Sequence, residues 1–164
     1  MLSRLDFLFR MRLRGASAIV GASFAAVLVL SVALFFLVGN SRVARILYFP
    51  SSTGSRVLAE MRLVPRHAGL EASVQEAADS ALLGPTRPDA DRLFPRGATV
   101  TAVMANGRTL YVDLTPQVLI DDPEVPLKTR AALDVLTRSL RLNFPRFTQV
   151  VYLIDGQLPR FAQR

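Results

Sequence analysis

The chain of 164 residues has no cysteine, no tryptophan and a single histidine, His67. Without cysteine it has no disulfide, no thiolate nucleophile and no cysteine to carry a lipid. One imidazole cannot build a typical zinc site. A catalytic histidine also needs a nucleophile and an orienting partner nearby. We therefore interpret His67, in the loop "VPRHAGL", as a surface residue, and we predict no metal and no cofactor.

Lysine is almost absent, because nineteen of the twenty basic residues are arginine. The net charge of +7 divides into +3 for residues 1–14 and +4 for residues 42–164, where sixteen basic residues face twelve acidic ones. These arginines are spread along the chain, which favours a mixed, solvated surface. A basic patch formed only by folding stays open as an alternative.

The longest apolar run is "GASAIVGASFAAVLVLSVALFFLV", residues 15–38, which contains no charge. As a helix it would rise about 36 Å, enough to cross a hydrocarbon core of about 30 Å. A signal peptide has a shorter apolar region and a small-x-small cleavage site, which "FFLVGNSR" does not offer. We expect an uncleaved, single-pass anchor in the cytoplasmic (inner) membrane.

Arginines at 4, 10, 12 and 14 precede the span, so the positive-inside rule places the N-terminus in the cytoplasm. The expected organisation is a basic cytoplasmic tail at 1–14, an anchor with a short linker at 15–41 and an extracytoplasmic domain at 42–164. The short linker predicts that this domain stays close to the membrane.

The soluble part begins with two strand patterns. "RILYF" (45–49) ends at Pro50, and "RVLAEMRLV" (56–64) alternates between two faces. Val57, Ala59, Met61 and Leu63 lie on the apolar face of the second strand, with Arg56, Leu58, Glu60 and Arg62 on the other. This pattern predicts a half-buried strand with a wet side.

A helix follows, for which Ser73 in "SVQE" is the expected N-cap. Its apolar stripe comprises residues 70, 74, 77, 78, 81 and 82. Gly84 is a typical left-handed residue after a helix, and Pro85 cannot continue one.

A hairpin and a second helix complete the pattern. "TVTAVMA-NG-RTLYVDL" predicts a type I′ turn at Asn106-Gly107, with Leu110, Val112 and Leu114 on one face. The next helix buries Ala132, Leu133, Leu136, Leu140 and Phe144, pairs Asp134 with Arg138, and ends at Pro145. "TQVVYLI" (148–154) is the last strand. The order β-β-α-β-β-α-β predicts an α/β fold of the α+β type: a mixed, mostly antiparallel sheet with two helices on one face.

Acidic residues provide the candidate chemistry. "IDDPEVP" groups Asp121, Asp122 and Glu124, but it lacks the spacing of a calcium loop, and acids before a helix complement its dipole. Asp89 and Asp91 have Arg87 and Arg92 as neighbours. Phosphate loops, nucleophile elbows and cysteine nucleophiles are missing from the sequence. Nucleic-acid binding is not expected either, since the strands lack the paired aromatic residues that stack bases.

Six segments, in this order and spacing, resemble the GerMN domain, a sporulation and spore-germination domain of anchored bacterial envelope proteins. The resemblance spans about two-thirds of the chain, from 46 to 157, and its segments are "LYFP" (47–50), "LAEMRLV" (58–64), "LLGP" (82–85), "FPRGATVTAV" (94–103), "LYVDLT" (110–115) and "SLRLNFPRFTQVVYLIDG" (139–156).

The resemblance implies a compact α/β domain similar to the ring-building modules of envelope secretion assemblies. It also implies an assembly, accessory or localisation role without enzymatic activity. The family-motif positions, with a structural role, are Glu60, Arg62, Gly84, Pro85, Pro95, Gly97, Asp113, Leu140, Pro145, Asp155 and Gly156. Family members commonly continue past the Asp-Gly turn, whereas this sequence has eight residues after Gly156.

Our leading hypothesis is a non-enzymatic membrane protein whose outer domain binds other envelope proteins or further copies of itself. The solvent-facing residues of "RILYF" and "YLIDGQL" are the expected surface. One alternative is a module that binds a small ligand or cell-wall glycan in a pocket with an aromatic floor. The other is a hydrolase, for which Asp113 and Asp155 are the acids that could pair.

Overall fold

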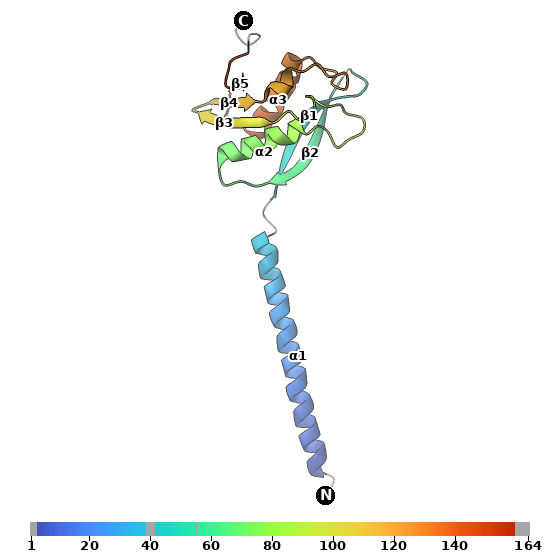
Figure 1. Cartoon of the computed structure of the whole chain (residues 1–164). Helices are drawn as coiled ribbons and strands as arrows, with labels where there is room; N and C mark the ends of the chain where they lie inside the picture. Colours follow the sequence, from blue (N-terminus) through green and yellow to red (C-terminus); the bar gives the residue numbers. More distant parts are fainter. Residues whose placement is uncertain (1–2, 39–41, 55, 160–164) are drawn as a thin grey trace. The chain divides into compact units, whose positions relative to one another are not determined.

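The computed structural model describes residues 3–38, 42–54 and 56–159 (Figure 1). The chain divides into two compact units, residues 1–41 and residues 42–164. Every residue of the hydrophobic core lies between Leu47 and Ile154. The second unit therefore contains a complete core of its own.

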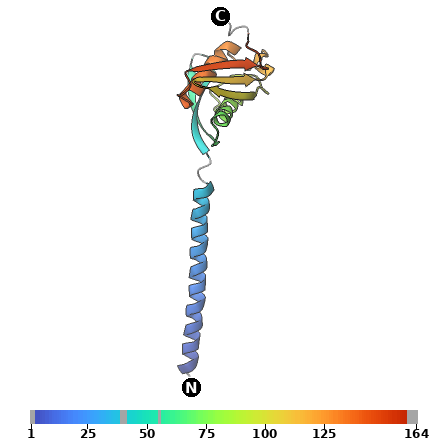
Figure 2. The same ribbon diagram turned by 90° about the vertical axis from the view of Figure 1, so that its left-hand side faces the viewer.

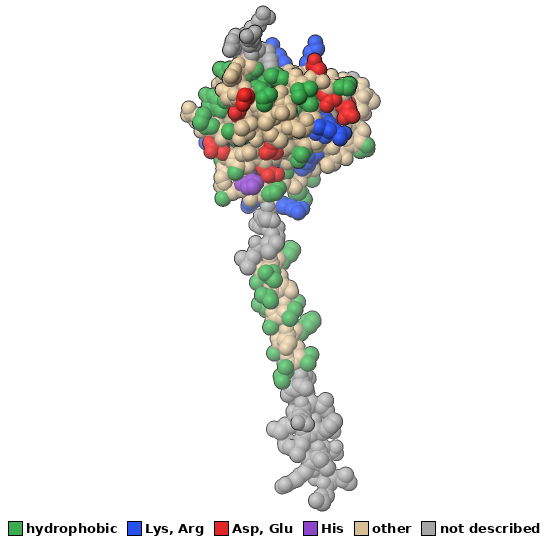
Figure 3. All heavy atoms as spheres, viewed as in Figure 1, with side chains coloured by type: hydrophobic (Ala, Val, Ile, Leu, Met, Phe, Trp, Pro, Cys, Tyr) green, Lys and Arg blue, Asp and Glu red, His purple; other side chains and the backbone are tan. Residues whose placement is uncertain are grey.

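The first unit is the helix α1 (Ser3–Val38). Its stretch Ile19–Phe36 has a mean hydropathy of 2.6 and is fully exposed. Charged side chains do not interrupt the part of this helix whose side chains are described (Figure 3). The apolar run predicted as a helix is thus helical, and it is long and apolar enough to cross a membrane.

The second unit follows the predicted order of elements. These are β1 (Arg42–Pro50), β2 (Val57–Pro65), α2 (Leu70–Leu82), β3 (Val100–Asn106), β4 (Thr109–Leu114), the short 3-10 helix η1 (Pro116–Leu119), α3 (Thr129–Asn143) and β5 (Gln149–Ile154). The α+β fold class is confirmed. The strands form two sheets: an antiparallel hairpin of β1 and β2, and a three-stranded sheet β3-β4-β5 in which β4 and β5 run parallel.

The apolar stripes of the two helices meet the strands in one core. The stripe of α2 is buried as predicted except for the half-buried Leu70, and that of α3 is fully buried. On β4, Leu110, Val112 and Leu114 point into the core. In Figure 2 the three-stranded sheet is seen with the helices behind it, on one side only. The β1–β2 hairpin contributes Leu47 and Phe49 and packs against both helices.

The predicted faces of β2 are the wrong way round. Met61 and Leu63 on the apolar face are 72% and 64% exposed, whereas Glu60 on the polar face is only 7% exposed. The polar face can be buried because Glu60 and Arg62 form an ion pair. The apolar side chains that fill the core at this position are Leu47 and Phe49 of β1, so the apolar face of β2 is left exposed there.

Two details at the ends of elements also differ from the predictions. The N-cap of α2 is Gly69, four residues before Ser73, because the helix extends to include Leu70 of the apolar stripe. Ser73 lies inside the helix, and its hydroxyl donates to the carbonyl oxygens of His67 and Gly69.

The hairpin between β3 and β4 turns at Gly107-Arg108, since Asn106 is paired with Thr109. Of these residues Gly107 alone has a positive φ, +58°. This is the pattern of a type II′ turn, in which glycine occupies the first central position, instead of the predicted type I′ turn.

Candidate functional site

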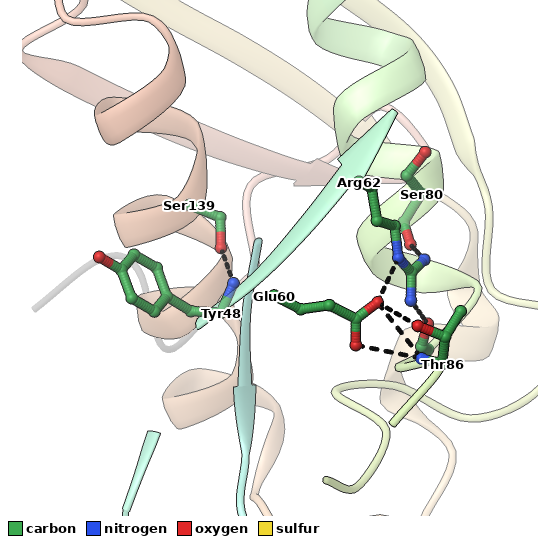
Figure 4. Close-up of polar contacts among 7 residues, drawn as sticks. Tyr48, Glu60, Arg62, Ser80, Thr86 and Ser139 are labelled. Atoms are coloured by element: carbon green, nitrogen blue, oxygen red, sulfur yellow. Dashed lines mark hydrogen bonds and ion pairs between the residues drawn. The ribbon is translucent and has the colours of Figure 1, made fainter. Parts of the chain in front are cut away.

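Glu60 and Arg62 form the centre of a buried polar cluster that joins β2 to the end of α2 (Figure 4). The Glu60 carboxylate accepts hydrogen bonds from Arg62 Nε at 2.6 Å, from the Thr86 hydroxyl at 2.7 Å and from the Thr86 amide at 3.1 Å. Burial raises the pKa of Glu60, but these hydrogen bonds outweigh it and hold the pKa below its ordinary value. The carboxylate is therefore kept ionised.

The guanidinium of Arg62 binds the C-terminal end of α2. It donates to the carbonyl oxygens of Ser80 at 2.7 Å and Gly84 at 2.5 Å, and it lies over the Phe49 ring. A cation at this end complements the helix dipole and satisfies carbonyls that have no partner within the helix. The cluster therefore fixes where the chain leaves α2.

Gly84 is required at that exit for two reasons. Its φ is +93°, as predicted for a residue that ends a helix, and an added Cβ would lie 3.1 Å from Arg92 Cγ. Pro85 follows, and Thr86 then binds Glu60. The structure thus brings Glu60, Arg62, Gly84 and Pro85 together, although Glu60 and Gly84 are 24 positions apart in the sequence.

Other motif positions lie in turns or in the core. Pro95 accepts a hydrogen bond from the Ala98 amide across a turn that contains Gly97. Leu140 is buried in the core, and its carbonyl accepts from the amide of Phe144 directly before Pro145. These positions shape the backbone and offer no reactive group.

Asp113 and Asp155, the pair considered for hydrolysis, belong to the turn after β5. Asp113 Oδ1 accepts from the Gly156 amide at 3.0 Å, and the Asp155 amide donates to the Leu114 carbonyl. Asp155 is exposed and has a φ of +53°. The Asp113 carboxylate is thus occupied in holding a turn, and this geometry gives no support to paired-carboxylate catalysis.

The acids of "IDDPEVP" are not at a helix end, contrary to the prediction. The helix α3 begins only at Thr129, and its first turn contains no acid. Asp122 Oδ1 accepts from the Glu124 amide, and Glu124 lies 3.4 Å from Arg96. Among the described residues, no group of three or more histidine, aspartate or glutamate side chains could hold a metal ion.

The remaining charged residues considered as functional candidates, among them His67 and Asp89, form exposed ionic contacts. His67 Nε2 lies 3.3 Å from the carboxylate of Glu76, and both groups are accessible to solvent. Arg87 binds Asp89 through two hydrogen bonds at 2.6 and 2.9 Å. The predicted pairing of Arg87 with an aspartate is therefore present. The predicted Asp134–Arg138 pair is not formed among the described residues, because Arg138 lies 4.3 Å from the centre of the Tyr48 ring.

Two shallow hollows bear on the ligand-binding alternative. One, of about 400 Å³, lies between the loop 118–129 and residues 93–95, and is lined mainly by proline and aliphatic side chains. The other, of about 550 Å³, includes Tyr48. Arg138 covers the face of that ring, so it is not free for a sugar to stack on. Phe94 in the first hollow and Phe147 in the second are both buried, so neither hollow has an open aromatic floor.

The outer edge of β1 is closed by side chains from α3. Asn143 accepts from the Ile46 amide at 3.0 Å and donates to the Ile46 carbonyl, while the Ser139 hydroxyl accepts from the Tyr48 amide at 2.9 Å (Figure 4). The segment 89–91 bonds to the end of the same edge at Pro50 and Ser52. The backbone of "RILYF" is therefore unavailable for strand addition, contrary to the expected surface.

The outer edge of β3 is closed by α2 in the same manner. Asp79 Oδ1 accepts from the Val100 amide at 2.9 Å, and Glu71 Oε1 accepts from the Ala105 amide at 2.8 Å. Burial raises the pKa of Asp79, although the hydrogen bond from Val100 opposes this shift. Glu71 in the first turn of α2 and Asp79 near its end thus occupy two outward amides of this strand.

The outer edge of β5 is open among the described residues. Gln149 and Asp155 donate to carbonyls at the two ends of β4, and β5 runs parallel to β4. Since every second residue of a parallel strand bonds to its neighbour, Val151 and Leu153 also face β4, and the backbone groups of Val150 and Tyr152 face outward. In the described part of the chain, neither of these two amides has a hydrogen-bond partner on that side.

The outer edge of β2 is open as well. Because the Ile46 and Tyr48 amides bond to α3, their partners Met61 and Ala59 belong to non-hydrogen-bonded pairs of the β1–β2 ladder. The amides of Ala59, Met61 and Leu63 therefore point away from β1, and no described residue accepts from them. In the described part of the chain, helix side chains bind two of the four sheet edges, and the other two are left open.

Solved structures resemble this chain in fold. The first GerMN domain of the sporulation protein GerM from Bacillus subtilis is 19% identical, with a TM-score of 0.58 over 72% of this chain and 86% of that one. The tandem GerMN domains of the same protein are 20% identical, with a TM-score of 0.59 over 73% of this chain and 43% of that one. No family model and no curated protein matches at the level of sequence. The globular part of this chain has the fold of a GerMN domain.

Proposed function

We propose that this chain is a non-enzymatic, membrane-anchored protein of the bacterial envelope whose GerMN-like domain assembles with other proteins by strand addition. The observation that carries the proposal is the pair of open edges on β2 and β5. Unpaired amides and carbonyls in a row bind an extended segment readily, and proteins normally close such edges. In this domain the edges of β1 and β3 are closed by dedicated side chains.

The proposed location rests on the first unit. The apolar helix is long enough to span a bilayer, and the arginines before it favour a cytoplasmic N-terminus. The domain would then lie on the extracytoplasmic side, attached through the uncleaved helix. The neighbours with the same fold are domains of a sporulation protein, and their fold alone assigns no process to this chain.

Two different open edges favour a particular kind of self-assembly. Pairing β2 of one copy with β5 of the next joins unlike surfaces, so the contact repeats and produces a ring or a filament. A partner protein that supplies an extended strand would occupy one of the same edges. In both cases backbone hydrogen bonds provide much of the affinity.

The test uses the absence of cysteine in the natural sequence. A single cysteine at the exposed Gln149 of β5 is the sole attachment site for a thiol-anchored photo-cross-linker in cells, which reacts with any chain beside that edge, and the cross-linked species are identified by mass spectrometry. We expect cross-links to further copies or to a small set of envelope proteins. We expect Val150→Pro to reduce them at least about tenfold, since proline removes an outward donor and is tolerated on edge strands.

Two variants make the experiment specific. Ala59→Pro removes an outward amide of β2 and tests that edge independently, with the thermal unfolding midpoint of each variant as the check on folding. Val151→Lys is the matched control for Val150→Pro, because it alters the neighbouring side chain but keeps the backbone groups of the edge. Unchanged cross-links in both proline variants, or a domain recovered only as a monomer, would contradict assembly through the edges.

A further inference from the structure

The exposed face of the β1–β2 hairpin is mainly apolar, with Arg42 at its end. Residues of this face alternate along both strands, and opposite positions pair Ile46 with Met61 and Ala44 with Leu63. Met61 and Leu63 are the most exposed, while Ile46 and Val57 are about 40% exposed. We call this surface the hairpin face; its residues are Arg42, Ala44, Ile46, Tyr48, Val57, Ala59, Met61, Leu63 and Pro65.

The positive charge of the domain is concentrated in the same hairpin. Residues 42–66 contain five arginines and one glutamate, a net charge of +4, whereas residues 67–164 contain eleven basic and eleven acidic residues and are neutral. The one glutamate, Glu60, lies on the buried face and is bonded to Arg62. Arg42, Arg56 and Arg66 are exposed. Within residues 42–66 the hairpin therefore presents three exposed cations and no exposed acid.

Two cations of the hairpin lie close enough to influence each other. Burial lowers the pKa of Arg45, and the nearby Arg66 lowers it further, so two cations of the hairpin repel each other. Arg45 also lies over the Phe144 ring.

The chain connects this hairpin closely to the apolar helix. The last residue of α1 is Val38, and β1 begins at Arg42. Four residues of extended chain reach at most about 14 Å. The polar headgroup layer on each side of a bilayer is about 5–8 Å thick. A membrane-spanning α1 therefore keeps the start of β1 within reach of the headgroups.

We propose that the hairpin face docks on the surface of the bilayer, with Met61 and Leu63 inserted among the lipids and the surrounding arginines bound to anionic headgroups. Apolar insertion combined with attraction to anionic lipid is how interfacial segments bind membranes. The proposal relies on the membrane location proposed above, but it uses a face of β1–β2 instead of an edge. Each can therefore fail without the other.

The lack of tryptophan in the sequence allows a direct test. Tryptophan is introduced singly, as Met61→Trp, in the full-length protein reconstituted into vesicles of phosphatidylcholine mixed with phosphatidylglycerol. Met104→Trp is the matched control, because Met104 is 57% exposed on β3 of the other sheet. We expect a blue-shifted emission and strong quenching by brominated lipid for Met61→Trp, and neither for Met104→Trp.

The second experiment measures affinity with residues 42–164, which contain the complete core. We expect this fragment to bind the mixed vesicles, to bind pure phosphatidylcholine far less, and to be released as salt rises. Met61→Glu with Leu63→Glu should weaken the partition at least about tenfold, whereas Met104→Glu should leave it unchanged. Both hairpin residues are exposed, so the fold tolerates these charges.

Three outcomes would overturn the docking proposal. They are an unquenched tryptophan at position 61, equal quenching at 61 and 104, and an affinity that is unaffected by the two glutamates. Loss of in-cell cross-links in the glutamate variant with unaltered vesicle binding would mark the hairpin face as a protein interface instead. Val150→Pro lies on β5 and leaves the hairpin face unaltered, so this variant reports on assembly separately.

Discussion

At the scale of single residues, Glu60 and Arg62 explain how a strand can bury its polar face. Glu60 is held by Arg62 and by two groups of Thr86, and Arg62 is shared between this carboxylate and the carbonyls at the end of α2. Removing one partner of a buried pair leaves the other charge uncompensated, which is more costly than removing both. The two side chains therefore act as a unit.

A double-mutant cycle tests this coupling. We expect Glu60→Gln and Arg62→Met each to lower the free energy of unfolding by about 2–4 kcal/mol at neutral pH. The double variant should lose less than the sum, with a coupling energy of about 1 kcal/mol or more. Urea denaturation of residues 42–164 measures all four states. Arg87→Ala, which removes an exposed ion pair, is the control and should change stability little. Strict additivity would contradict the coupling.

The same residue predicts how stability depends on pH. The folded state lowers the pKa of Glu60 below its ordinary value of 4.5. The resulting stabilisation is fully present above the ordinary pKa, and it is lost as pH falls through the lower, folded-state pKa. The stability difference between the wild type and Glu60→Gln should therefore shrink on acidification below about pH 4.5. A difference that grows in this range would contradict the hydrogen-bonded carboxylate.

At the scale of elements, the helices close two sheet edges with polar side chains. Asn143 bonds both backbone groups of Ile46, in place of the strand that would otherwise pair there. Asp79 and Glu71 serve β3 in the same way. These contacts decide which strands are free to bind a partner, because an unprotected edge attracts other chains.

Opening the β1 edge should therefore have a second consequence besides lost stability. We expect Asn143→Ala to lower the free energy of unfolding by about 1–2 kcal/mol, since two hydrogen bonds to Ile46 are lost. It should also increase self-association of residues 42–164 in light scattering. Arg141→Ala, an exposed change on the same helix, is the matched control. If Asn143→Ala associates no more than this control, the side chain does not protect the edge.

The sequence predicts some of these elements well and others poorly, for physical reasons. The stripes of α2 and α3 and the buried face of β4 follow from periodicity, because each has one clearly apolar side. The buried face of β2 does not follow from periodicity, because its ion pair depends on a hydrogen bond from Thr86, which is distant in sequence. The blocked edges also depend on tertiary contacts: a serine such as Ser139, fully buried within an apolar stripe, is the one local signal of such a role.

Turn chemistry limits the prediction in another way. The sequence Asn-Gly favours a type I′ turn, but the pairing of Asn106 with Thr109 shifts the turn by one residue. The register follows from the burial of Leu110 and Val112, because a slip of one position would turn these side chains to solvent. Core packing therefore overrides the local preference.

At the scale of the whole molecule, the chain combines an apolar helix with a domain whose charge is uneven. The net charge of residues 42–164 resides in residues 42–66, directly after the helix in sequence, while the open edges lie on β2 and β5. We propose a separate task for each surface: lipid binding for the hairpin face, and protein binding for the two edges.

Hydrogen exchange of individual backbone amides tests the central claim, strand addition at open edges, most directly. The full-length protein is compared as a detergent-solubilised monomer and in native membranes. We predict that in the monomer Val150 and Tyr152 exchange much faster than Val151 and Leu153, which donate to β4, and that in membranes the two outward amides become protected. Protection of Val150 and Tyr152 in the monomer, or rapid exchange in both states, would contradict it.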